Sequence, residues 1–451
     1  MPRWFFTSLL GLGGVAAITL SNAFQPSTPG RVEVMPPPPP ATAGPLSLTA
    51  DLDYAALADH GTSKRNLVIT IHAPEADTDA RRLPVDLAVV VDTSGSMNES
   101  GKFVQARRAM HALAAQLTDA DRMALVTFSS FTSTPVLLGN ASQNGPLAAN
   151  LLDHMSPDGS TYLSGGLSSG FEALGYGETG RVRRVLLMTD GRANQGVIDT
   201  AGLTRLARAK PGVSVSTIGM GLDYDEAMLS AVADAGGGDY HYVAQDTDMG
   251  LVYAEELRSA STLVATSASL DLTFPAGVTA PRACSWTSYA LPNNGLRVQI
   301  GDLSAGQTRT IVIPIEVSPS VDGVLASAIL HATSPDGAPY DASTSITAPR
   351  VALSDVPAHV HPTADAAATL ALAGDAVDQA REAWNRGDDE YAKGRLTWGS
   401  DYMRSKREEG NMNEKDNAVL EAQSAELKSL GYLDGAQGVK AASTVSRKMS
   451  R

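Results

Sequence analysis

The sequence is poor in cysteine, in aromatic residues and in positive charge. Its one cysteine, Cys284, excludes an intramolecular disulfide bond, so the stability of the chain must come from packed cores. Aromatic residues make up 5% of the chain, and its formal net charge is −14. Binding to nucleic acid needs clustered Lys and Arg that contact phosphates, so we expect no nucleic-acid partner. The length of 451 residues predicts two or three domains.

The first 45 residues are typical of an exported protein. Arg3 precedes an uncharged apolar stretch at 4–20, and the small residues at 21–23 fit a cleavage site. Residues 1–23 are therefore a signal peptide or an N-terminal membrane anchor, and both interpretations stay open. Residues 24–45 form a Pro-rich linker. In either case we expect an extracytoplasmic protein, which is periplasmic, on the cell surface or secreted.

The pattern of hydrophobic residues differs along the rest of the chain and divides it into several parts. Short apolar runs first alternate with helical segments, which predicts an α/β fold with a mostly parallel, doubly wound sheet of the Rossmann-like type. Strand-like segments separated by Gly and Pro turns follow, and they predict an antiparallel β-sandwich. The predicted parts are two strands in 46–83 that join the sandwich, the α/β domain in 84–261, the β-sandwich in 262–350, a helical region in 362–433 and a disordered tail in 434–451.

The α/β part has four predicted strands and four predicted helices. The strands are the apolar runs Leu87–Val91, Met123–Phe128, Val185–Thr189 and Val213–Gly219. The helices are the segments Phe103–Leu117, Leu163–Leu174, Thr200–Ala209 and Asp225–Ala235. Alternation of this kind places the carboxyl ends of the strands at one edge of the sheet, where open α/β sheets bind their ligands.

Five oxygen-bearing side chains occur at that edge. Asp92, Ser94 and Ser96 follow the first run directly, Thr161 precedes a predicted helix, and Asp190 ends the third run. Hard oxygen donors suit Mg²⁺, Mn²⁺ or Ca²⁺, whereas zinc prefers His and Cys. Because only two of the five ligands are carboxylates, the cation keeps an open position that a carboxylate from another protein can fill.

The ordered set Asp92-x-Ser94-x-Ser96, Thr161 and Asp190-Gly191 resembles the complete metal-ion-dependent adhesion site of von Willebrand factor type A domains. The flanking residues of the first and third runs are similar to those of bacterial secreted members and of inter-alpha-trypsin inhibitor heavy chains. The resemblance implies a doubly wound sheet with one antiparallel edge strand near Pro135–Leu138. It also implies a bound cation, Mg²⁺ or else Mn²⁺ or Ca²⁺, and cation-dependent protein binding in adhesion or assembly.

Other interpretations of the same residues stay open. Ser, Thr and Asp at strand-to-helix junctions are ordinary helix caps, and a cation in a structural envelope protein can have a purely structural role. A metal-dependent hydrolase would need a general base, and the sequence offers none beyond the ligands themselves. The Gly-x-Ser-x-Gly pattern at Gly166–Gly170 lies inside a predicted helix with no strand before it, unlike a nucleophile elbow. We therefore expect no catalytic residues and no enzymatic activity.

Overall fold

The computed structural model describes most of the chain from residue 41 onward. The described residues are 41–75, 83–178, 180–190, 193–220, 225–243, 257, 262–433, 438–439, 441–442, 445–446 and 449. The predicted signal or anchor and the first part of the linker lie outside these residues. Within the described ranges, no helix is long and apolar enough to cross a membrane.

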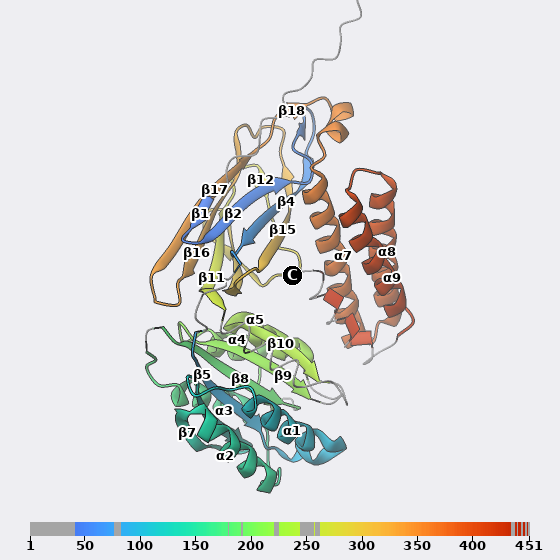
Figure 1. The fold of residues 1–451 in the computed structure, drawn as a ribbon. Helices are drawn as coiled ribbons and strands as arrows, with labels where there is room; N and C mark the ends of the chain where they lie inside the picture. Colours follow the sequence, from blue (N-terminus) through green and yellow to red (C-terminus); the bar gives the residue numbers. More distant parts are fainter. Residues whose placement is uncertain are drawn as a thin grey trace, which may run out of the picture. The chain divides into compact units, whose positions relative to one another are not determined.

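A six-stranded sheet forms the centre of the α/β part (Figure 1), and its strand order is β10-β9-β8-β5-β6-β7. Every pair of neighbours is parallel except β6 and β7. This is the predicted doubly wound, mostly parallel sheet, and its antiparallel edge strand is β7. The strands are β5 (Val85–Asp92), β6 (Arg122–Phe128), β7 (Thr132–Asn140), β8 (Val182–Thr189), β9 (Ser214–Met220) and β10 (Gly237–Val243).

Helices cover both faces of this sheet because its strands are apolar on both faces. The side chains of Val89 and Val91 pack with α1 and α2 on one face, and those of Ala88 and Val90 pack with α3, α4 and α5 on the other. This alternation is the period-two pattern of a strand buried on both sides. The helices are α1 (Lys102–Ala114), α2 (Ala141–His154), α3 (Leu163–Ala173), α4 (Thr200–Ala207) and α5 (Glu226–Gly236).

Helix α2 and strand β10 were not predicted, because each contains residues that normally break regular structure. Pro146 lies inside α2, where it removes one backbone hydrogen bond. The neighbouring Gly145 approaches α1 so closely that an added Cβ would lie 2.9 Å from the Cβ of Ala114. Strand β10 begins with Gly237 and Gly238. In both cases tertiary packing overrides the local preference.

A β-sandwich of two five-stranded sheets encloses a second core. The sheet orders are β1-β2-β4-β15-β12 and β13-β14-β11-β16-β17. Strand β4 pairs with β15 along its whole length, although more than 200 residues separate them. The α/β part is thus inserted between β4 and β11. The strands are β1 (Ala41–Ala43), β2 (Leu46–Leu52), β4 (Ser63–His72), β11 (Leu263–Thr273), β12 (Val278–Thr279), β13 (Ser288–Leu291), β14 (Gly295–Ser304), β15 (Thr308–Val317), β16 (Val324–Thr333) and β17 (Pro339–Thr347).

The junction between the two parts is close and partly charged. Gly237 at the start of β10 and Gly301 in β14 both have positive φ, and an added Cβ on Gly301 would lie 2.9 Å from the Cα of Gly237. Only glycine fits such a backbone approach. The buried guanidinium of Arg184 in β8 forms an ion pair of 3.6 Å with Asp302 in β14. The sandwich therefore holds one edge of the parallel sheet directly.

Three helices follow the sandwich and form a further core, and α7 also packs on the sandwich residues Val68 and Val312. They are α7 (Pro362–Asn385), α8 (Asp389–Glu408) and α9 (Glu414–Leu430). The described residues of the C-terminal segment differ from the disordered tail that we predicted. They are helical, and Ala442, Val445 and Met449 are buried in the same core as α7. Their apolar side chains recur at helical spacing, which would have predicted a helix. The basic residues of the segment led us to predict disorder instead.

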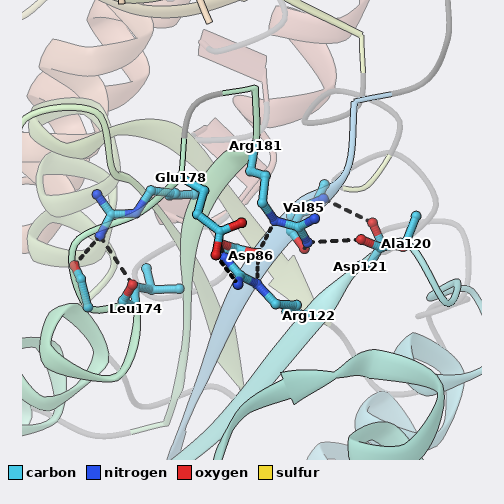
Figure 2. A network of polar contacts seen from close by, with 10 residues as sticks. Val85, Asp86, Ala120, Asp121, Arg122, Leu174, Glu178 and Arg181 are labelled. Carbon is cyan, nitrogen blue, oxygen red and sulfur yellow. Dashed lines mark hydrogen bonds and ion pairs between the residues drawn. The ribbon is translucent and has the colours of Figure 1, made fainter. Parts of the chain in front are cut away.

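A network of charges stabilises the amino-terminal end of the sheet, at the opposite end of β5 from Asp92 (Figure 2). The fully buried carboxylate of Asp86 accepts two hydrogen bonds from Arg122, at 2.8 and 2.5 Å, and one from Arg181 at 2.6 Å. Arg122 also donates to the exposed Glu178 at 2.7 Å. Planar guanidinium groups match a carboxylate in this bidentate way. The network connects β5, β6 and the residues before β8.

We expect Asp86→Ala to lower the free energy of unfolding by about 3–5 kcal/mol, because the change leaves two partly buried guanidinium groups without their shared counter-charge. The matched control is Glu178→Gln, whose carboxylate is 66% exposed. That change should cost less than about 1 kcal/mol. Urea denaturation of both variants measures the difference. Equal losses in the two variants would contradict a structural role for the buried pair.

Candidate metal centre

Asp92 and Asp190 lie side by side at the carboxyl ends of neighbouring strands. Asp92 is the last residue of β5, and Asp190 directly follows β8, its parallel neighbour. Both carboxylates are buried. The order of strands reverses between β5 and β8, so this is the switch point where α/β sheets bind ligands. The Thr189 hydroxyl donates a hydrogen bond of 2.5 Å to Asp92 Oδ2.

The two serines after β5 turn back towards these carboxylates. The backbone N–H of Ser94 donates to Asp92 Oδ1 at 2.8 Å. The hydroxyl oxygens of Ser94 and Ser96 lie 3.2 Å apart, and Ser96 Oγ donates to Asp190 Oδ1 at 2.9 Å. The structure therefore joins four of the five predicted ligands through one chain of polar contacts.

Thr161 reaches the same corner through its backbone. The loop before α3 is fixed to the serine loop by a hydrogen bond of 3.0 Å from Gly95 N–H to the carbonyl oxygen of Gly159. The buried Thr161 donates its N–H to Asn194 Oδ1 at 2.8 Å, on the loop that follows Asp190. Gly191, which belongs to the same predicted motif, lies outside the described residues.

The structure adds a residue that the sequence reasoning missed, Lys102 in the first turn of α1. Its ammonium group is 2.6 Å from Asp190 Oδ2, and the side chains of Lys102 and Asp190 are 4% and 0% exposed. A cation is disfavoured near the amino terminus of a helix, because the helix dipole is positive there. The position of this lysine, in the first turn of a helix and next to the apolar Phe103, is the sequence feature that could have indicated a nearby carboxylate as its partner.

The donor set fits a small divalent cation. Carboxylate and hydroxyl oxygens are the ligands that Mg²⁺ accepts. Octahedral Mg²⁺ with bonds of about 2.1 Å places neighbouring ligand oxygens about 3.0 Å apart. The observed oxygen separations are 3.2 Å between Ser94 and Ser96 and 2.9 Å between Ser96 and Asp190. No group of three or more His, Cys, Asp or Glu suited to a metal occurs in the described ranges, so a cation held here would need the hydroxyl oxygens as ligands.

Burial changes the acidity of Asp92. Removal from water raises its pKa from 3.8 to about 6; the hydrogen bonds from Thr189 and Ser94 act in the opposite direction, and the nearby charge of Asp190 adds to the rise. Near neutral pH this carboxylate is therefore ionised at a cost. A bound divalent cation would remove that cost, because it favours the charged form.

A cavity of about 540 Å³ lies elsewhere, where the α/β part, the sandwich and α7 meet. Its walls include the pair of Arg184 and Asp302 and the pair of Arg282 and Asp375, whose closest atoms are 2.6 Å apart. Charges that already face one another indicate a polar junction between the parts. The cavity contains none of the five predicted ligands.

The switch-point position, the oxygen donors and the antiparallel edge strand are the features that the resemblance to von Willebrand factor type A domains implies. Residues 86–256 match the family model described as "von Willebrand factor type A domain". The chain therefore contains a domain of this family. The predicted boundaries of 84–261 enclose the matched region.

Comparisons with individual proteins extend this result. The chain is 27% identical over 271 residues to uncharacterized protein YfbK of Escherichia coli (strain K12), covering 58% of this chain and 47% of YfbK. It is 26% identical over 183 residues to inter-alpha-trypsin inhibitor heavy chain H1 of Bos taurus, covering 38% of this chain and 20% of that protein. This chain thus spans less than half the length of either relative.

One solved structure resembles nearly the whole chain. It is the von Willebrand factor type A protein from Catenulispora acidiphila, with a TM-score of 0.67 and 17% sequence identity. The match covers 91% of this chain and 97% of that one. The shared fold therefore extends beyond residues 86–256 to the flanking parts.

Because the pKa of Asp92 is raised, we expect the free energy of unfolding of the metal-free protein to depend on pH. Between pH 4 and about 6 the folded state holds a proton that the unfolded state has released, so stability falls as the pH rises through this window. The loss is about 3 kcal/mol at about 1.4 kcal/mol per pH unit. In EDTA, we expect Asp92→Asn to remove this decline and to be more stable than the unaltered protein at pH 7, by up to that amount.

Chemical denaturation in EDTA at several pH values between 4 and 7.5 measures this effect. Asp199→Asn is the control, because that exposed helix cap keeps its capping oxygen. Magnesium should then stabilise the unaltered protein and the control, but not Asp92→Asn. Parallel stability curves for all three proteins in EDTA would show that Asp92 is not destabilised by burial.

Proposed function

We propose that this chain is an extracytoplasmic protein-binding module in which a divalent cation bridges to a carboxylate of a partner protein. The cation, Mg²⁺ first of all, would be held by Asp92, Ser94, Ser96, Thr161 and Asp190. The observation that carries the proposal is the continuous contact of Asp92, Ser94, Ser96 and Asp190 at the switch point. Domains of the von Willebrand factor type A family in general mediate divalent-cation-dependent protein interactions.

The charge balance of the site supports a ligand of opposite charge. Asp92 and Asp190 contribute two negative charges, and Lys102 contributes one positive charge. Addition of a divalent cation gives −2 + 1 + 2, a net charge of +1. Ser96 is the least buried of the ligand side chains, which leaves a route to solvent on its side. A partner carboxylate arriving there would neutralise the centre.

A purely structural metal is the second interpretation, and the contacts of Asp190 and Asp92 argue against it. Asp190 already has Lys102 as a counter-charge, and Asp92 accepts hydrogen bonds from Ser94 and Thr189. The corner therefore has protein partners for both carboxylates. A hydrolase is less favoured, because among the described residues the side chains that contact the two carboxylates are Ser, Thr and Lys, and that lysine is paired.

The extracytoplasmic part of the proposal depends on residues 1–23. Their uncharged apolar stretch and small residues support export, either by cleavage or as an anchor. Fractionation of cells and mass spectrometry of the mature amino terminus distinguish these two cases. A cytoplasmic protein with an intact amino terminus would contradict this part without affecting the metal centre.

Thr161→Val tests the metal centre with little disturbance of packing, because it replaces one hydroxyl by a methyl group. Asp190→Ala is a poorer test, since it leaves the buried Lys102 ammonium unpaired. We expect Thr161→Val to weaken Mg²⁺ binding about tenfold, equivalent to about 1.4 kcal/mol, in isothermal titration calorimetry. The control is Thr217→Val, which removes a buried hydroxyl in β9 that is not one of the predicted ligands.

The same proteins are then used to capture partners from the cell envelope and medium, in Mg²⁺ and in EDTA. We expect partners that bind the unaltered chain and Thr217→Val only in Mg²⁺ and that bind Thr161→Val weakly. Capture of the same partners in EDTA would instead indicate a structural metal, and the sandwich and C-terminal helices would then be the binding surfaces to test.

A further inference from the structure

Three exposed apolar side chains lie on the loops that adjoin the candidate metal centre. Phe131 is 83% exposed, Ile198 is 55% exposed and Val197 is 41% exposed. We refer to these three residues as the apolar rim. Single exposed apolar residues are common on protein surfaces and need no explanation. A group of three such residues beside a candidate metal centre does need an explanation.

The loop of Phe131 is attached to the loop of Thr161 by the backbone. Ser130 Oγ accepts a hydrogen bond of 2.9 Å from the N–H of Ser160, the residue before Thr161. The N–H of Tyr162, the residue after it, donates to the carbonyl oxygen of Ser129 at 2.9 Å. Phe131 is thus one residue away from a segment that contacts the loop on both sides of Thr161.

The loop of Val197 and Ile198 is fixed on the same side. Asn194 Oδ1 accepts a hydrogen bond of 2.8 Å from the N–H of Thr161, and the N–H of Asn194 donates to the carbonyl oxygen of Thr161 at 3.2 Å. Val197 N–H donates to Ser164 Oγ at 3.0 Å, in the first turn of α3. Gln195 Nε2 donates to the carbonyl oxygen of Ser130 at 3.0 Å, which connects this loop to the loop of Phe131. The apolar rim therefore belongs to one hydrogen-bonded group of loops.

The short segments that carry the apolar rim and hold Thr161 are themselves uncharged. The segments 129–131, 159–164 and 193–198 contain no Asp, Glu, Lys, Arg or His. Asp158, Arg192 and Asp199 directly adjoin these segments, and the centre itself would have a charge of +1 with a cation bound. The whole chain has a formal net charge of −14. An acidic patch on a partner would be repelled by the chain as a whole, whereas one carboxylate would be attracted by the centre at short range.

We propose that this face binds a peptide segment in which one Asp or Glu is flanked by apolar side chains that contact Phe131, Val197 and Ile198. This inference rests on the proposed function, since the acidic side chain is the one that the cation holds. The carboxylate supplies orientation, and burial of apolar area against the apolar rim supplies much of the affinity. An acidic cluster lacking apolar neighbours is the wrong partner for this surface.

The test is a selection of random dodecapeptides displayed on phage against the full chain in Mg²⁺, followed by elution with EDTA. We expect the eluted peptides to be enriched in one Asp or Glu with an apolar residue within two positions. The double variant Phe131→Ser/Ile198→Ser should keep the acidic preference and lose the apolar one. Tyr176→Ser, a fully exposed aromatic residue on the loop after α3, is the control and should select like the unaltered chain.

The most enriched peptide is then synthesised and titrated into each protein. We expect the double variant to bind it about tenfold or more weakly, with its Mg²⁺ affinity unchanged. Acidic peptides without flanking apolar residues, selected by the unaltered chain, would overturn the role of the apolar rim and leave the proposed function intact. EDTA-eluted peptides without an acidic preference would overturn the proposed function itself, and this inference with it.

Discussion

The candidate site depends on two buried carboxylates that lie next to each other. Asp92 and Asp190 are brought together because β5 and β8 are parallel neighbours that end at the same level. Loss of hydration raises the pKa of Asp92, and the nearby charge of Asp190 adds to the rise. The protein offsets this in part with the ammonium group of Lys102 and the hydroxyl of Thr189. The remaining negative charge is what makes the corner suited to a divalent cation.

The scaffold holds the sheet at its amino-terminal end and along one edge. At the amino-terminal end, Asp86 joins Arg122 and Arg181 in a buried ionic network (Figure 2). At one edge, Gly237 and Arg184 contact the sandwich. Neither contact lies among the ligands, so the chemistry of the corner can vary while the frame stays the same. Such separation of frame and site is typical of α/β folds, whose loops carry the function.

The alternating strands and helices were predictable because their signals are local. Continuous apolar runs predicted β5, β6 and β8, and the period of Phe103, Ala106 and Met110 predicted α1. Several of the elements that escaped prediction have a local signal that points the other way. Pro146 conceals α2, the glycines conceal β10, and the basic residues of the tail conceal the buried helical positions Ala442, Val445 and Met449. In each case burial against a distant segment outweighs the local preference.

The sequence by itself determined the order and the chemistry of the predicted ligands. Asp92, Ser94 and Ser96, together with Thr161 and Asp190, predict an oxygen-donor site because coordination depends on residue type and on position after a strand. Only the tertiary structure decided what surrounds the ligands. The pairing of Lys102 with Asp190 joins residues 88 positions apart, and the apolar rim combines two separate loops. Contacts of this kind depend on how the backbone brings distant segments together, which no local pattern records.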